Sequence, residues 1–137
     1  MTETANVAQR ASNNLILLID DQPIFLKAIA ALLEELGYRV TPTSCPMEAI
    51  QFFKEKSYFL VLCDLYMSSL SGYKLLTRFN HDKPEQVCCL MTGAELDEPL
   101  LKKTLRLNNV KGYIKKPIKF EELDRLLANI KKQQLSV

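Results

Sequence analysis

Short apolar segments alternate with helical patterns along this chain, and this alternation constrains its fold more than any other feature. Five apolar, β-rich segments recur, at residues 15–19, 39–43, 59–63, 87–91 and 112–115. The first, third and fourth are almost continuously apolar, which is typical of parallel strands covered on both faces. A helix after each strand predicts right-handed crossovers and an open parallel sheet with helices on both sides. The sequence therefore predicts one α/β domain of (βα)5 architecture.

The segments that follow the predicted strands carry apolar residues at helical spacing. Two helices are predicted to begin beside Pro23 and at Pro46, and the first to end at Gly37. Three further patterns predict helices over 73–79, 96–107 and 120–130. Pro42 removes a ladder donor from the second strand, which places that strand at an edge of the sheet. The predicted inner faces of the first two helices are Ile24, Ala28, Leu32 and Leu36 in the first, and Met47, Ile50 and Phe53 in the second.

The domain is predicted to span residues 14–132. Residues 1–13 are polar and are predicted to form a disordered tail, and residues 133–137 a C-terminal tail. The N-terminal segment lacks the apolar stretch of a signal peptide, and no apolar run is long enough to span a bilayer. We therefore expect a cytoplasmic protein with no membrane partner.

The composition argues against several kinds of site. A single histidine disfavours histidine triads and multi-histidine metal sites, and four glycines without GxGxxG or GxxxxGK[ST] leave no glycine-rich phosphate loop. The net charge of +2 indicates no preference for nucleic acid, so no direct DNA binding is expected. The charge is uneven, because residues 100–137 hold ten Lys and Arg against three acidic residues. This basic region is interpreted as a solvated surface, with an acidic protein partner as the weaker alternative.

Four cysteines without a CxxC spacing indicate reduced, mostly buried thiols. Cys88 and Cys89 are adjacent on a predicted strand, so their side chains are expected on opposite faces of the sheet and not in a joint zinc site. A redox switch built on this pair stays open as an alternative. The other two cysteines are Cys45 and Cys63.

Polar residues stand where four of the predicted strands end. The carboxyl ends of parallel strands share one edge of an open sheet, where ligands bind. Grouped carboxylates repel unless a cation joins them, and hard oxygen ligands suit Mg²⁺. A lysine and a threonine hydroxyl can bind phosphoryl oxygens, and an aspartate can accept a phosphoryl group, so the set predicts phosphoryl transfer. Taken singly, the acidic pair could be a helix cap and the Lys-Pro pair a loop. The residues are Asp20, Asp21, Asp64, Thr92, Lys115, Lys116 and Pro117.

The sequence resembles the response-regulator receiver domains of two-component signalling, the CheY-like family. The motifs that carry this resemblance are LLIDDQP, VLCDLYMSSLSG, LMTGA and YIKKP, and the resemblance covers about residues 15–130. It implies a flavodoxin-like, doubly wound sheet with strand order 2-1-3-4-5. It also implies a site for Mg²⁺ or Mn²⁺ made by Asp20, Asp21, Asp64 and the backbone carbonyl of Tyr66.

The resemblance further assigns roles in phosphorylation and switching. Asp64 is implied to be the phosphoacceptor, with Lys116 and Thr92 binding the transferred group. Thr92 and Tyr113 are implied to form the switch pair, and a cis peptide bond is expected before Pro117.

Five further positions near these motifs bear on the lifetime of the phosphoryl group and on loop shape. Tyr66 and Ala94 are expected to flank the phosphoryl group, and their types predict slow self-dephosphorylation. Gly72 falls where the family commonly has glycine. Ser68 stands where proline is frequent and Gln22 where an acidic residue is frequent, and both departures are expected to affect loop shape only.

The function implied is a signalling switch that catalyses only its own phosphorylation and dephosphorylation. A histidine kinase or histidine phosphotransfer protein is expected to donate the phosphoryl group. A downstream protein is expected to dock on the face of the fourth helix, fifth strand and fifth helix, and a homodimer on phosphorylation is left open. The alternatives are a Mg²⁺-dependent aspartyl-nucleophile phosphatase and a receiver module excised from a longer regulator. His81 is interpreted as a solvated loop residue and not a phosphotransfer histidine.

Overall fold

Strands and helices alternate through the part of the chain that the computed structural model describes, residues 13–135. The predicted N-terminal tail, residues 1–13, lies outside the described residues except for Asn13. The strands are β1 (Leu15–Ile19), β2 (Arg39–Thr43), β3 (Leu60–Asp64), β4 (Cys88–Thr92) and β5 (Val110–Lys115). The helices are α2 (Pro23–Glu35), α3 (Pro46–Glu55), α4 (Gly72–Asp82), α5 (Pro99–Leu105) and α6 (Phe120–Leu135).

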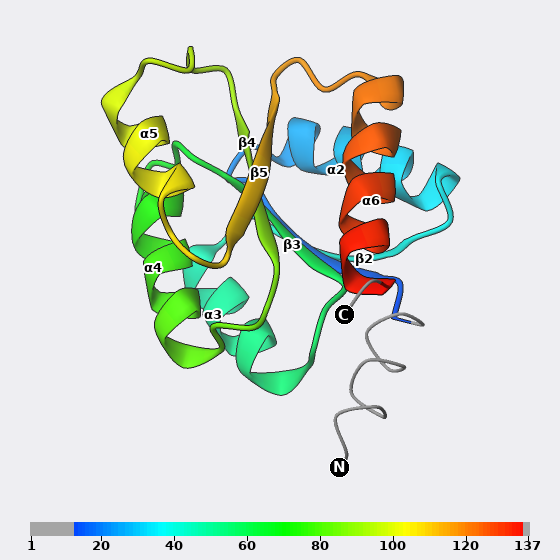
Figure 1. Cartoon of the computed structure of the whole chain (residues 1–137), viewed down its shortest axis with the longest axis horizontal. Coiled ribbons are helices and arrows are strands. Elements are labelled where there is room, and N and C mark those ends of the chain that lie inside the picture. The colour runs from blue at the N-terminus through cyan, green and yellow to red at the C-terminus, as the bar shows by residue number, and fades with distance from the viewer. Residues whose placement is uncertain (1–12, 136–137) are drawn as a thin grey trace.

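The five strands form one parallel sheet in the order β2-β1-β3-β4-β5, which confirms the predicted topology. The strand that contains Pro42 lies at an edge, as predicted. Helices α2 and α6 cover one face of the sheet, and α3, α4 and α5 cover the other (Figure 1). The loops that follow β4 and β5 lie together at the top of Figure 1, and this carboxyl edge of the sheet carries the candidate site.

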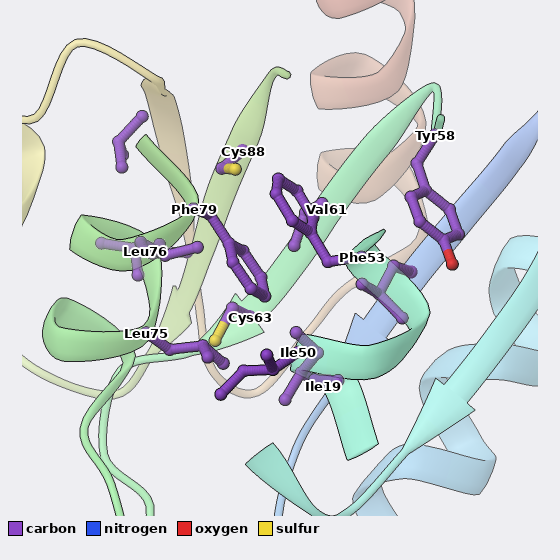
Figure 2. Close-up of a cluster of buried hydrophobic side chains, with 14 of the residues drawn as sticks. Ile19, Ile50, Phe53, Tyr58, Val61, Cys63, Leu75, Leu76, Phe79 and Cys88 are labelled. Atoms are coloured by element: carbon purple, nitrogen blue, oxygen red, sulfur yellow. The ribbon is translucent and has the colours of Figure 1, made fainter. Parts of the chain in front are cut away.

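The core is divided by the sheet into two clusters. On the side of α3 and α4, the rings of Phe53 and Phe79 are stacked with centroids 3.9 Å apart, over strand residues such as Cys63 (Figure 2). Cys88 belongs to this cluster and Cys89 to the one under α2 and α6, so their predicted opposite orientation is confirmed. All four cysteines are free, and all of them except the exposed Cys45 are buried.

The predicted inner faces of the first two helices are wrong in part. In α2, Ile24 is 84% exposed, Ala28 is exposed as well, and Leu32 and the C-cap residue Leu36 are only partly buried. The buried residues of this helix are Ile29, Ala30 and Leu33. A strict four-residue spacing turns by about 40° at each step around a helix of 3.6 residues per turn, so such a row cannot stay on one face. Met47 is likewise exposed in the first turn of α3.

Several element ends also differ from the predictions. Strands β3 and β4 each end one residue later than predicted, because backbone pairing continues regardless of side-chain polarity, through Asp64 with Met91 in β3 and through Thr92 with Lys115 in β4. Helix α4 extends through His81, which is an exposed helical residue and not a loop residue, and Lys83 N closes the last turn on the Phe79 carbonyl at 2.8 Å. Helix α6 continues to Leu135, past the predicted boundary at residue 132.

Candidate functional site

Three carboxylates meet at the carboxyl edge of the sheet. Asp20 follows β1, Asp21 is its neighbour, and Asp64 is the last residue of β3. One ligand oxygen from each lies within 4.8 Å of the others. Asp20 is fully buried and Asp64 nearly so, whereas Asp21 is partly exposed. Strands β1 and β3 are neighbours in the sheet, so their parallel ends bring these groups together.

The Lys116 ammonium lies between two of these carboxylates. Its Nζ is 2.9 Å from Asp20 Oδ2 and 3.3 Å from Asp64 Oδ2, and the lysine side chain is only 17% exposed. The backbone positions it as well, because Lys116 N donates to the Thr92 carbonyl at 2.8 Å. The Lys116–Pro117 peptide bond is cis, the isomer expected from the sequence.

Burial and the neighbouring charges shift the pKa of the Asp64 carboxyl group. Desolvation raises the pKa of Asp64 to about 6, against the lowering effect of the nearby Lys116 cation, while Asp20 and Asp21 add to the rise. One ammonium against three carboxylates leaves two negative charges without a partner when all three are ionised. This charge and the hard oxygen donors are what a divalent cation such as Mg²⁺ requires.

Hydrogen bonds from Gln22 and Ser68 orient the carboxylates of Asp20 and Asp21, and these contacts were not predicted from the sequence. Gln22 N donates to Asp20 Oδ1 at 2.9 Å. Ser68 donates to Asp21 Oδ2 from both its N–H at 2.8 Å and its hydroxyl at 3.1 Å. A proline at position 68 would have neither donor. The departure at position 68 therefore contacts an acidic group directly, and the absence of proline there was the signal that could have shown it. The Gln22 contact is made by the backbone and does not depend on the side chain at position 22.

Gly72 brings helix α4 against the end of β3. Gly72 N donates to the Leu65 carbonyl at 2.7 Å. A Cβ at position 72 would overlap the carbonyl oxygen of Asp64 and lie 3.0 Å from Leu65 Cα. Only glycine permits this close approach, which fixes the backbone of Asp64.

Thr92 and Tyr113 lie on the neighbouring strands β4 and β5. Thr92 is buried at the end of β4, and its Oγ1 accepts a hydrogen bond from Ala94 N at 3.0 Å. Tyr113 is half-buried on β5 and packs against the core cluster on the side of α3 and α4. Among residues 13–135 no hydrogen bond or ion pair links either residue to Asp20, Asp21 or Asp64.

Tyr66 is half-exposed and links the loop after β3 to the start of α5. Its hydroxyl donates a hydrogen bond to the Glu98 carboxylate, which raises the pKa of Tyr66 to about 12 and lowers the pKa of Glu98. The Glu98 carboxylate also accepts from Leu100 N and Leu101 N at 3.1 and 3.0 Å, as the N-cap of α5. Sequence reasoning gave no sign of this contact, because it depends on the path of two loops.

Comparison with known proteins agrees with this geometry. The doubly wound five-stranded fold with an acidic cluster and a lysine at its carboxyl edge defines a CheY-like signalling domain. Residues 16–128 match the family described as response regulator receiver domain. The chain belongs to this family, whose members are switches of two-component signalling and not conventional enzymes.

The similar proteins come from several organisms. The phosphoglycerate transport system transcriptional regulatory protein PgtA of Salmonella typhimurium is 33% identical over 122 residues, which cover 89% of this chain and 29% of PgtA. The two-component response regulator ORR22 of Oryza sativa subsp. indica is 28% identical over 84% of this chain and 16% of its own length. The signal receiver domain of an HD domain-containing protein from Pseudomonas fluorescens Pf-5 aligns with a TM-score of 0.81 at 27% identity, covering 90% of each chain. This chain thus spans less than a third of both curated relatives. No helix within residues 13–135 has the length and apolarity needed to cross a membrane.

Proposed function

We propose that this chain accepts a phosphoryl group on Asp64 from a phosphohistidine of a histidine kinase or a histidine phosphotransfer protein. In this step an Asp64 carboxylate oxygen bonds the phosphorus, and the bond from phosphorus to the donor's imidazole nitrogen breaks. The observation that carries the proposal is the position of Lys116 Nζ, 3.3 Å from Asp64 Oδ2 in a largely buried site. A fixed cation there would stabilise the charge on the transferred oxygens.

The site would use Mg²⁺ or Mn²⁺. Asp20, Asp21, Asp64 and the backbone carbonyl of Tyr66 would hold the ion, and the three converging carboxylates support this assignment. Bound there, the ion would neutralise charge on the phosphoryl oxygens. Ser68 would keep the Asp21 carboxylate in place through its two hydrogen bonds.

We infer that phosphorylation is read through Thr92 and Tyr113. The Thr92 hydroxyl accepts one hydrogen bond and keeps its own proton for donation to a phosphoryl oxygen. Movement of Thr92 would shift the loop after β4 and draw Tyr113 inward, which changes the face formed by α5, β5 and α6. A downstream protein, or a second phosphorylated copy, would dock there.

The lifetime of the phosphoryl group would be long. Tyr66 would hinder an attacking water, and the methyl group of Ala94 has no polar atom to orient one. Phosphorylated Tyr66→Ala is expected to lose its phosphoryl group faster than the wild type. Faster decay in the wild type would contradict this assignment.

Of the two alternatives, the aspartyl-nucleophile phosphatase gains no support, because Tyr66 stands where those enzymes usually carry a second aspartate. A receiver that works beside an output domain in one polypeptide is favoured by the curated relatives, of which this chain spans less than a third.

Incubation with acetyl phosphate and Mg²⁺ tests the proposed function. The wild type is expected to gain one hydroxylamine-sensitive phosphoryl group by intact mass, and Asp64→Asn none. Asp82→Asn is the matched control, since Asp82 is at the other end of the domain and, within residues 13–135, forms an ion pair with Arg78 alone, at 3.7 Å. Phosphorylation of Asp64→Asn to the wild-type extent would refute the assignment.

A further inference from the structure

We propose that Phe25 is a positioning residue of the site, whose ring face holds the Lys116 ammonium within reach of Asp64. Phe25 lies in the first turn of α2, and its ring centroid is 4.8 Å from Lys116 Nζ. This distance lies within the range of about 6 Å over which a cation is attracted by an aromatic face. The inference rests on the proposed phosphoacceptor function of the same site.

The Phe25 ring is the third group around the Lys116 ammonium, beside two carboxylates. A lysine ammonium has three N–H donors. Two carboxylate oxygens lie around it, Asp20 Oδ2 at 2.9 Å and Asp64 Oδ2 at 3.3 Å, and the Phe25 ring is a third neighbour. The lysine side chain is 17% exposed, so the ring stands where water would otherwise solvate the cation.

A ring face has a property that another carboxylate would lack. It attracts the cation and carries no net charge, so it leaves the full positive charge of Lys116 available to a phosphoryl group. The nearer carboxylate, the fully buried Asp20, competes with Asp64 for the same ammonium. Without the ring, the lysine would have more freedom to leave the oxygen on which the phosphoryl group would form.

Burial in the core does not explain why an aromatic residue stands at position 25. The residue remains 43% exposed, and its neighbour Ile24 on the same first turn is 84% exposed. Two further lysines of residues 13–135 lie over rings, Lys83 over Phe53 and Lys103 over Tyr73. Neither of those lysines forms an ion pair, so within the described chain the combination of ring and paired carboxylates is specific to Lys116.

Two measurements on Phe25→Leu and Phe25→Tyr test the role. The first is the rate of phosphorylation by acetyl phosphate with Mg²⁺. Loss of a cation–π contact worth about 0.5–1 kcal/mol corresponds to a rate lower by about 2- to 5-fold in Phe25→Leu, with the rate retained in Phe25→Tyr. Tyr73→Leu is the matched control, because it removes a ring from beneath Lys103, and its rate is expected to equal that of the wild type.

The second measurement does not depend on phosphoryl transfer. In protein labelled with ¹³C at the lysine ε-carbons, the Lys116 ε-proton signal, assigned from its loss in Lys116→Arg, is expected to be shifted upfield by the ring. Phe25→Leu should abolish this shift and Phe25→Tyr should keep it. Unchanged signal and rate in Phe25→Leu would overturn the positioning role. If the wild type shows the shifted signal but takes up no phosphoryl group, it is the proposed function that fails.

Discussion

Replacing Gly72 with alanine should destabilise the domain, because the new methyl group meets backbone. The added Cβ would overlap the Asp64 carbonyl oxygen, and would lie 3.0 Å from Leu65 Cα and 3.2 Å from the Asp64 carbonyl carbon. These atoms belong to the end of β3 and cannot rotate away as a side chain can. Insertion of a methyl group into such a site costs about 1–3 kcal/mol. Because all the neighbouring atoms are backbone, the upper end of this range, about 3 kcal/mol, applies here. Alanine favours a helix over glycine by up to about 1 kcal/mol, so we expect a net loss of about 2 kcal/mol.

Urea unfolding followed by circular dichroism measures this loss, and a thermal scan should show a midpoint lower by roughly 6–10 °C. Gly93→Ala is the matched control. A Cβ there has no neighbour within 4 Å, and among the described residues only Gly37 has a φ in the left-handed region, at 96°. Gly93→Ala should therefore be neutral or stabilising by up to about 1 kcal/mol, through the entropy of the unfolded chain. A Gly72→Ala protein as stable as Gly93→Ala would refute the steric reasoning.

Three further outcomes are expected. A thiol reagent at pH 8 should label Cys45 alone in the native protein, because burial raises the pKa of the other three thiols. Rapid labelling of Cys63, detected by peptide mass spectrometry, would contradict this expectation. Gln86→Leu should lower the unfolding free energy, measured in urea, by about 2–4 kcal/mol, because the Gln86 side-chain amide accepts from Tyr58 N at 3.0 Å and donates to Tyr58 O at 2.8 Å. A loss below about 0.5 kcal/mol would count against a stabilising role for these two hydrogen bonds. In EDTA, the wild type should gain stability relative to Asp64→Asn, by up to about 3 kcal/mol, as the pH falls from 7 to 4. The folded pKa of Asp64, about 6, lies above its usual 3.8, so the folded state binds this proton more tightly in that window; a difference independent of pH would contradict this.

The parts of the fold and site that follow from topology could be predicted from the sequence. Parallel strands must end at a common edge, so Asp20, Asp64 and Lys116 could be placed together before any distance was known. Pro42 could be placed on an edge strand for a similar reason, since its missing donor is tolerated only there.

The contacts that could not be predicted depend on how loops and first turns run. Ser68 reaches Asp21 from a loop 47 residues later in the chain, and no periodicity encodes that path. Phe25 belongs to no motif or apolar row that the sequence singles out, yet in the structure the Lys116 ammonium lies over its ring. The exposed Ile24 shows the same limitation, because a four-residue spacing does not fix which way the first turn of α2 faces.

The position of Asp64 shows why stability and function are difficult to separate at this site. Asp64 lies between Cys63 and Leu65, both fully buried, and Lys116 is the cation that offsets its charge. Removing Lys116 would leave two buried carboxylates without their cation, so a loss of phosphorylation in such a variant would not by itself distinguish misfolding from lost chemistry. Phe25 is half-exposed and contacts the same ammonium without carrying charge, so its substitution changes the surroundings of Lys116 and leaves the cation itself in the site. It is therefore at Phe25, and not at the charged residues, that the contribution of the lysine to phosphoryl transfer can be measured separately from its contribution to folding.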